Sequence, residues 1–362
     1  MLFVVHGLLL ICTIIFLKAK GQLKLISKIL FTYLFFIIVM IIGSRVGGPD
    51  YSSYAEIYSL TSFSCIGFPL FECFSGTTGN EFIYAFLSSI FVSFNLSLVC
   101  WFFFVGALSV LIKLAIYRKV SNYFWLSVFI FFSLVFHKEI GQIRNALAGG
   151  VILWAVYFAV HKNFKLFIFS VLLASGVQIF SLSAIVLYPL INFNLNKSLL
   201  LKFGSVVILT SSFFGGITSI LVEYSNIFPP ILARKLLGYF DNDQSYETGL
   251  LSLIFILLVL FSAGFSKHFS RDKYAYGYAI CIFYGVLGYF LFKDVATLGG
   301  RFGDMFVLGA MPIFFARIVD FFSSRYKFTP YFIVLIFGTV MFYRVMYKFP
   351  AYESFLFPEL AF

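Results

Sequence analysis

Long runs of apolar residues, separated by short polar stretches, follow one another along almost the whole chain. Many of these runs approach the roughly 20 residues that an α-helix needs to cross the core of a bilayer. They are continuously apolar, whereas strands of a transmembrane β-barrel alternate between apolar and polar positions. The pattern therefore predicts an all-α, polytopic membrane protein. We expect spans at 2–17, 29–43, 96–116, 123–136, 146–160, 166–191, 203–222, 250–265, 274–292, 302–316 and 331–343.

Two apolar stretches do not fit a simple span. Residues 82–94 are too short and follow a polar loop, so we expect an interfacial helix at the outer surface. Residues 166–191 are too long for one span and too short for two, and Ser175-Gly176-Val177-Gln178 offers a natural break. A broken hairpin there places the later loops as the positive-inside rule requires. The interpretation is one polytopic domain, 1–362, with about twelve membrane segments and outer loops at about 44–95 and 223–249.

The composition agrees with this class. The chain is 61% hydrophobic and only 11% charged, with 53 Phe among 362 residues, whereas soluble domains average about 25% charged residues. The net charge of +11 is read as a record of topology and not as nucleic-acid binding. The first apolar run lacks the basic start and the cleavage site of a signal peptide. A positive cluster follows it at Lys18, Lys20, Lys24 and Lys28, so we expect the N-terminus outside and this first loop inside.

Most basic residues fall in loops that this topology places inside, while nearly all acidic residues, Glu139 among them, fall outside. The inside set comprises Lys18, Lys20, Lys24, Lys28, Lys113, Arg118, Lys119, Lys162, Lys165, Lys197, Lys202, Lys267, Arg271, Lys273, Arg317, Arg325 and Lys327.

Several basic residues lie outside, where the insertion bias does not explain them: Arg45, Arg144, Arg234, Lys235 and Arg301. Planar guanidinium groups match phosphate oxygens, so these residues suggest a phosphate-bearing lipid as ligand. Simpler explanations stand beside this one, because Arg45 can snorkel to the interface and Arg301 can pair with Asp304 one turn later.

Helical spacing and residue type add further candidates. His137 and Arg144 lie seven residues apart, on one face if a single helix carries both. Tyr51 and Tyr54 follow Asp50, and tyrosine rings beside carboxylates are common sugar-stacking surfaces. Asp50 can equally be a helix N-cap, with the tyrosines as interfacial aromatics.

The cysteines and acidic residues predict no metal centre, because no pair of cysteines shows metal-ligand spacing. Cys65 and Cys73 fall in one outer loop, where a disulfide and two free thiols are both open. We expect no metal and no cofactor.

The order of motifs resembles bacterial many-span proteins of the O-antigen polymerase (Wzy) and EpsG type. These carry an Arg before a Gly-Asp-x-x-x-Tyr element, matched here by Arg45 and Asp50-Tyr51-Ser-Ser-Tyr54. A short outer helix opened by a Glu follows, matched by Asn80-Glu81-Phe82. The fifth span of the family opens on Arg-Gln/Asn-x-x-Ala, matched by Arg144-Asn145-Ala146-Leu147-Ala148.

The later motifs continue the resemblance, with one departure. The family's broken hairpin usually carries His-x-Ser, where this chain reads Gln178-Ile179-Phe180-Ser181. A late Arg that opens a span is matched by Gly300-Arg301-Phe302-Gly303-Asp304. If the family His is a base, another group must replace it here, and Glu139, His137 and Asp50 are the candidates.

The resemblance implies a GT-C-like helical fold and a metal-independent glycosyltransferase on the outer, periplasmic face of the bacterial inner membrane. Its substrates would be undecaprenyl-diphosphate-linked oligosaccharide repeats, and the growing glycan would pass to a new lipid-linked repeat. A chain-length regulator and other assembly proteins are expected partners, with membrane lipid and no nucleic acid. The expected diphosphate ligands are Arg45, Arg144, Arg234, Lys235 and Arg301, the expected catalytic groups are Asp50, Glu139 and His137, and the expected glycan contacts are Tyr51, Tyr54, Gln178 and Asp304.

Two other functions use the same lipid. An O-antigen ligase would bring a large outer loop with a catalytic His, and the loop 223–249 contains no His. A flippase or transporter would line a path across the bilayer with charges, whereas here the unexplained cations gather at one predicted face.

Overall fold

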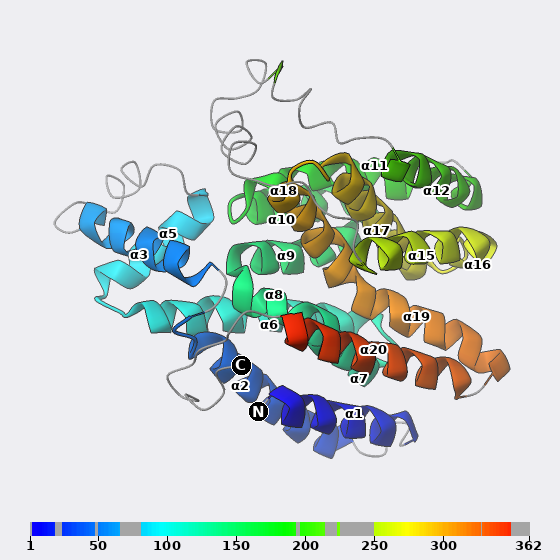
Figure 1. The fold of residues 1–362 in the computed structure, drawn as a ribbon, viewed down its shortest axis with the longest axis horizontal. Coiled ribbons are helices and arrows are strands. Elements are labelled where there is room, and N and C mark those ends of the chain that lie inside the picture. Colours follow the sequence, from blue (N-terminus) through cyan, green and yellow to red (C-terminus); the bar gives the residue numbers. More distant parts are fainter. Residues whose placement is uncertain are drawn as a thin grey trace. The chain divides into compact units, whose positions relative to one another are not determined.

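The apolar runs form helices because only a helix satisfies every backbone N–H and C=O within its own segment, as the bilayer core requires. The computed structural model describes residues 2–18, 24–47, 50–65, 81–192, 196–213, 223–224, 250–326 and 328–348. In these ranges the regular elements are α-helices, interrupted by one 3-10 and two π segments (Figure 1). The predicted all-helical class is confirmed.

Seven helical stretches in these ranges are long and apolar enough to cross a membrane. Five shorter apolar helices accompany them, including Phe82–Ser93 and the two parts of the predicted hairpin, Phe164–Ser175 and Ile179–Asn192. The polytopic class is therefore supported, while the number of about twelve segments stays a prediction. The seven stretches are Leu25–Gly43, Leu98–Val120, Phe124–Gly141, Ile143–Val160, Lys273–Leu291, Thr297–Ser323 and Thr329–Tyr347.

The chain divides into two compact units. Unit 1 contains Met1–Leu153, Ser170–Leu182 and Met311–Phe362, and unit 2 contains Trp154–Phe169 and Ser183–Ala310. The elements that lie wholly in unit 1 are α1 (Leu2–Lys18), α2 (Lys24–Gly43), α3 (Tyr51–Cys65), α5 (Phe82–Ser93), α6 (Leu98–Val120), α7 (Phe124–Ile130), η1 (Phe131–Val135), α8 (Phe136–Gly141) and α20 (Thr329–Lys348).

Three α-helices and one 3-10 helix cross from one unit to the other, and the remaining elements belong to unit 2. The crossing α-helices are α9 (Ile143–Val160), α10 (Phe164–Ser175) and α19 (Gly309–Tyr326). Unit 2 holds α11 (Leu187–Asn192), α12 (Lys197–Phe213), α15 (Leu250–Gly264), α16 (Ser266–Phe269), α17 (Lys273–Leu291), α18 (Ala296–Phe302) and η4 (Gly303–Leu308), and the 3-10 helix η2 (Ile179–Val186) follows α10.

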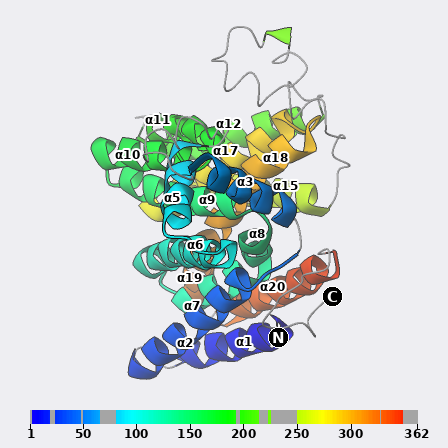
Figure 2. The same ribbon diagram turned by 90° about the vertical axis from the view of Figure 1, so that its left-hand side faces the viewer.

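In unit 1, helix pairs pack side by side and bring the predicted inside loops together. Helix α2 packs on α6, α1 on α7, and α20 on η1 and α7. At one end the indole of Trp125 donates to Ser27 Oγ at 3.0 Å, and Asn122 donates to Asp320 at 2.6 Å. Helices α3 and α5 pack against each other on another side of the unit (Figure 2).

In unit 2, too, loops that the charge pattern predicts to be inside lie close together. Helix α12 packs against α15, α16 and α17. Lys273 Nζ lies 3.1 Å from His161 Nε2, and the hydroxyls of Ser198 and Ser266 are 2.8 Å apart. The loops near 161, 196 and 270 therefore meet at one end of this unit, as the prediction of a returning hairpin requires.

The hairpin itself is confirmed by contacts between its two ends. Helix α10 ends at Ser175, a turn follows, and η2 begins at Ile179. On the return, the hydroxyl of Tyr188 donates to the carbonyl of Lys162 at 3.2 Å, and its ring centroid lies 5.0 Å from that of Phe164. The chain thus comes back to the level at which α10 began.

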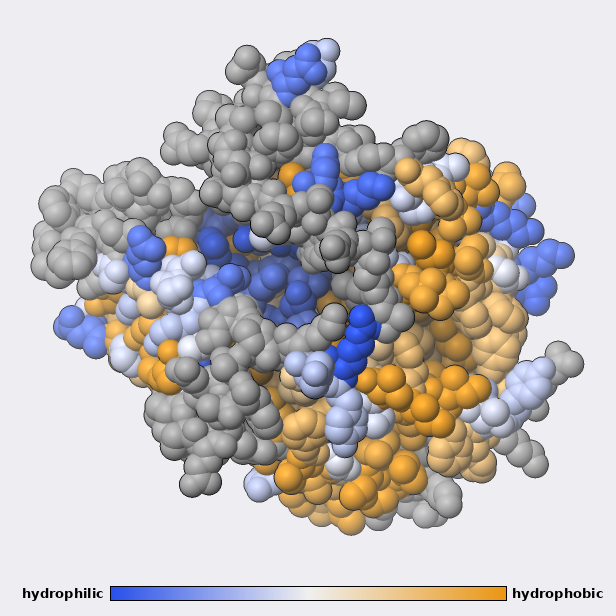
Figure 3. Space-filling model, viewed as in Figure 1, coloured by the Kyte–Doolittle hydropathy of each residue, from blue (hydrophilic) through white to orange (hydrophobic). Residues whose placement is uncertain are grey.

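Large apolar side chains remain exposed on many of these helices. Figure 3 shows broad hydrophobic areas on the face that it presents. Phe36 of α2 is 59% exposed, Phe203 of α12 is 64% exposed and Ile336 of α20 is 64% exposed. A soluble monomer rarely leaves such surfaces open to water, so these residues are the expected lipid-facing side chains.

Candidate functional site

Arg45 lies just beyond α2 and is completely buried. Its Cζ is 4.2 Å from the ring centroid of Phe102 on α6, and 5.9 and 5.5 Å from those of Tyr51 and Tyr54 on α3. Gly43, at the end of α2, permits close packing on α6, because a Cβ there would stand 2.2 Å from the ring of Phe103. The cation is held against aromatic faces, an arrangement that gains in strength when it is desolvated. Arg45 therefore does not simply snorkel to the interface, because its side chain is not exposed.

Asp50 directly precedes α3 with a backbone φ of +59°, in the left-handed region. Its carbonyl accepts a hydrogen bond from the backbone N–H of Tyr54 at 3.0 Å. A typical N-cap residue has extended backbone and uses its side chain to bind the first turn. Asp tolerates the left-handed conformation better than most residues. Asp50 therefore differs from a usual cap, and the residue is exposed.

Arg144 is the second residue of α9 and forms an ion pair with Glu81. Its Nη1 donates to Glu81 Oε2 at 2.9 Å, while Oε1 of the same carboxylate accepts from the backbone N–H of Ile179 at 3.4 Å. Glu81 occupies the N-cap position of α5 but makes no side-chain bond to that helix. One carboxylate thus connects α5, α9 and the tip of the hairpin.

The hairpin tip supplies the cap that Glu81 does not. The carbonyl of Gly176 accepts from the backbone N–H groups of Ile83 and Tyr84, at 2.7 and 3.2 Å. A Cβ at position 176 would stand 2.5 Å from Ile83 Cδ1, so glycine permits this close approach. Gln178, which stands where the family usually has His, is 3% exposed and lies next in the chain to Ile179.

The ring of Tyr54 joins the two arginines. The Cζ atoms of Arg45 and Arg144 each lie 5.5 Å from its centroid, and Arg144 is also 5.4 Å from the ring of Tyr84. We call Arg45, Tyr54, Glu81, Tyr84 and Arg144 the arginine cluster; all five belong to unit 1.

Tyr84 is a neutral member of this cluster. Its hydroxyl accepts a hydrogen bond from Trp101 Nε1 at 3.0 Å, and burial raises the pKa of Tyr84 above its ordinary value. The cluster therefore contains two cations and one carboxylate, and it carries a net positive charge.

The charge and the donors of the arginine cluster suit an anionic ligand. The Nε of Arg144 is buried and has no hydrogen-bond partner among the described residues. Burying a guanidinium donor without an acceptor is costly, so the arrangement suits an oxygen-rich ligand. Within the described ranges no group of three or more His, Cys, Asp or Glu side chains could hold a metal ion.

Glu139 and Lys113 correct the predicted placement of charges. Lys113 was expected in an inside loop and Glu139 outside, but Lys113 Nζ lies 2.7 Å from Glu139 Oε1 and both side chains are buried. Ser109 donates to Glu139 Oε2 at 2.7 Å, and the ammonium also donates to the carbonyl of Ala146 on α9. Lys113 lies well inside a candidate span, so it is an intramembrane partner and not a topology signal.

The remaining predicted residues either have no printed contact with this cluster or lie outside the described residues. His137 is half-buried on α8. Arg301 in α18 and Asp304 in η4 are half-buried in unit 2. Arg234, Lys235 and Cys73 lie outside the described residues, as does the side chain of Cys65.

Several structural residues escaped the sequence interpretation. The pairing of Lys113 with Glu139 had one available signal, namely that the four residues from Leu114 to Tyr117 continue the apolar run before the basic pair Arg118 and Lys119, so Lys113 stands within the run and not in the loop. The π segments η1 and η4 had none. Such segments often accompany functional sites. Here η1 directly precedes α8, and η4 includes Asp304.

Comparison with known proteins identifies the family. Searches of curated proteins and of solved structures found no match. A family model described as EpsG family matches residues 28–358. That range includes every member of the arginine cluster, and it covers nearly the whole chain. The polytopic helical fold agrees with a membrane protein of the polysaccharide-polymerase type. The chain therefore belongs to the EpsG family.

Proposed function

We propose that this protein polymerises polyisoprenyl-diphosphate-linked oligosaccharide repeats, such as undecaprenyl-diphosphate-linked units of an O-antigen or a similar surface polysaccharide. The observation that carries the proposal is the arginine cluster, in which the buried guanidinium of Arg45 and the partly exposed guanidinium of Arg144 share the ring of Tyr54. Membership of the EpsG family supports the reaction type. The proposed architecture is GT-C-like, in the bacterial inner membrane, with the cluster at the periplasmic face.

In the proposed reaction, a hydroxyl of the acceptor repeat attacks the anomeric carbon of the donor glycan. A new C–O bond forms, the bond from that carbon to the diphosphate oxygen breaks, and the diphosphate leaves with the electron pair. The hydroxyl proton passes to a base. Because the leaving group is already activated, the protein must chiefly position both lipids and stabilise the charge that develops on the diphosphate.

The arginine cluster supplies that stabilisation in our proposal. Arg144 is fixed by Glu81 through Nη1, which aims its remaining donors while Nε stays without a protein partner in the described chain. Arg45 adds a second positive charge at the same tyrosine ring. Charge-assisted hydrogen bonds are worth about 1.5–3 kcal/mol each, and preorganised donors lose little of this to reorganisation.

Asp50 is the proposed base for the acceptor hydroxyl. It is exposed and stands at the start of the helix that carries Tyr51 and Tyr54. Glu139 is a weaker candidate because its carboxylate is buried and engaged by Lys113 and Ser109. Tyr51 is half-buried and can stack on a sugar, whereas Tyr54 is 5% exposed and serves the arginines.

A transporter of the same lipid is the main alternative. It needs cations along a path through the bilayer, but Lys113, which lies within a span, is paired with Glu139 and offers no net charge to a diphosphate. A ligase would use the same donor, and the loop 223–249 lacks the His that such enzymes usually bring.

The proposal is tested by replacing Arg144 with Ala and examining the surface polysaccharide, with membrane insertion checked by fractionation. We expect the ladder of chain lengths to collapse to a single repeat unit. Loss of every repeat would indicate a transporter, and an intact ladder would refute the role of Arg144. The matched control is Arg118→Ala, which removes an exposed arginine from the same unit.

A further inference from the structure

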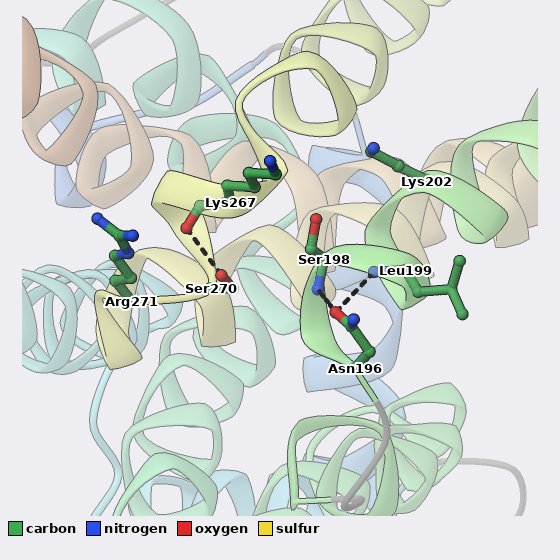
Figure 4. Close-up of a pocket in the computed structure, with 7 residues that line it drawn as sticks. All are labelled: Asn196, Ser198, Leu199, Lys202, Lys267, Ser270 and Arg271. Carbon is green, nitrogen blue, oxygen red and sulfur yellow. Dashed lines mark hydrogen bonds between the residues drawn. The ribbon is translucent and has the colours of Figure 1, made fainter.

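A second cationic feature lies in unit 2, in a pocket between the start of α12 and α16. The pocket has a volume of about 390 Å³ (Figure 4). Its lining is Asn196, Ser198, Leu199, Lys202, Lys267, Ser270 and Arg271. We call this the basic pocket. Its residues all belong to unit 2, so it is separate from the arginine cluster.

The charge of the basic pocket is of one sign. Three of its lining residues are cationic and none is acidic. None of Lys202, Lys267 and Arg271 forms an ion pair with another described residue. Asp272, the acid next to Arg271 in the sequence, caps α17, and its Oδ1 accepts from the backbone N–H groups of Tyr274 and Ala275 at 2.9 and 3.1 Å.

Hydrogen bonds hold the walls of the pocket in place. Asn196 Oδ1 accepts from the backbone N–H groups of Ser198 and Leu199 at 3.1 and 3.3 Å, which caps α12. The hydroxyls of Ser198 and Ser266 lie 2.8 Å apart and join the two walls, and Ser270 donates to the carbonyl of Lys267 at 2.8 Å. The walls are therefore fixed, while the long cationic side chains can adjust to a ligand.

An apolar stripe continues from the basic pocket along α12. Leu199, Phe203 and Val206 are 64%, 64% and 57% exposed. Their spacing of four and three residues places them on one face of the helix. A cationic pocket at the predicted inside end, with a lipid-facing stripe leading from it, matches a phospholipid, whose head group is anionic and whose chains are apolar.

We propose that the basic pocket binds the phosphate of an anionic phospholipid at the cytoplasmic end of unit 2. Lys202, Lys267 and Arg271 contact the phosphate, Ser198 adds a hydroxyl donor, and the acyl chains lie along Leu199 and Phe203. The pocket would fix unit 2 to the inner leaflet. This proposal does not depend on the identity of the reaction.

The experiment measures lipid binding to the purified full-length chain in detergent by native mass spectrometry. Phosphatidylglycerol is the anionic probe, phosphatidylcholine is the zwitterionic one, and inorganic phosphate is added as a competitor. We expect phosphatidylglycerol to bind in preference. Lys202→Ala and Lys267→Ala should each weaken its binding about fivefold, as befits one basic residue near a lipid surface.

Matched variants separate this site from general attraction between charges. Lys165→Ala removes an exposed lysine from the same predicted inside set and the same unit but outside the pocket, and should leave binding unchanged. Lys202→Arg keeps the charge and should retain binding. Leu199→Asn should weaken the lipid but not the inorganic phosphate.

Three results would overturn the proposal. These are equal binding of the two lipids by the wild type, an equal loss in Lys165→Ala and Lys202→Ala, and unchanged binding in both pocket variants. If inorganic phosphate binds and is lost in the pocket variants while neither lipid is preferred, the pocket takes a free phosphate compound and the lipid assignment is wrong.

Discussion

The buried pair of Lys113 and Glu139 gives a sharp prediction about stability. The two charges are 2.7 Å apart with side-chain exposures of 2% and 1%. At an effective dielectric constant of about 20, their attraction is about 6 kcal/mol. Taking each ion out of water costs several kcal/mol, so the net value of the pair relative to apolar residues is close to zero. Removing one partner alone is different, because it leaves an uncompensated buried charge.

We therefore expect opposite outcomes for single and double substitutions. Lys113→Met or Glu139→Leu alone should lower the free energy of unfolding by about 3–5 kcal/mol. The double variant should come within about 1.5 kcal/mol of the wild type, because an apolar pair of similar volume needs no compensating charge. In the double variant Ser109 and the carbonyl of Ala146 each lose a hydrogen-bond partner. These two losses account for the small decrease that we expect in its free energy of unfolding.

The assay is reversible unfolding of the detergent-solubilised chain, followed by the fluorescence of its 3 Trp residues, in a double-mutant cycle. Lys119→Met is the control, since Lys119 is exposed near the end of the same helix. Single losses that add up in the double variant would refute the reasoning, because they would show that the two charges do not compensate each other.

Three further predictions concern the arginine cluster and its surroundings. Glu81→Gln should leave the helices folded but reduce polymerisation at least tenfold, because Arg144 loses its charged anchor. The measurement is the glycan chain length formed by the reconstituted protein from lipid-linked repeats, and wild-type activity would contradict the prediction. Gly176→Val should destabilise the chain by about 1–3 kcal/mol in the same unfolding assay, because the new Cβ would meet Ile83. The control is Gly7→Val, since a Cβ at position 7 has open space. Asp50→Gly should fold as well as the wild type, since glycine accepts a φ of +59°, yet transfer glycan slowly; unimpaired transfer would remove Asp50 as the base.

The sequence predicted the order of the helices well because continuous apolar runs leave few alternatives. The positive-inside rule also paired the right loops within each unit, as the contacts of Asn122 with Asp320 and of Lys273 with His161 show. The break at Gly176 was found from length and residue type. These features depend on local composition and on whether the number of membrane crossings before a loop is odd or even, and both can be read from a single sequence.

Features that depend on three-dimensional packing were harder to predict. The positive-inside rule counted Lys113 in the inside set by its charge alone, whereas the structure pairs it with Glu139 from another helix. The role of Tyr54 as the ring shared by two arginines needs the side-chain packing of α2, α3 and α9. Family motifs pointed to Arg45, Glu81 and Arg144 separately, and the structure adds that they form one cluster in unit 1.

The central claim, that the arginine cluster holds a lipid diphosphate, is tested most directly by a binding measurement. Purified wild type, Arg144→Ala and the control Arg118→Ala would be titrated with undecaprenyl diphosphate and with undecaprenyl monophosphate. We expect Arg144→Ala to lose about 10- to 100-fold in affinity for the diphosphate, the equivalent of one charge-assisted hydrogen bond. Arg118→Ala should bind like the wild type, and the monophosphate should lose less. Equal diphosphate affinity in wild type and Arg144→Ala would contradict the account.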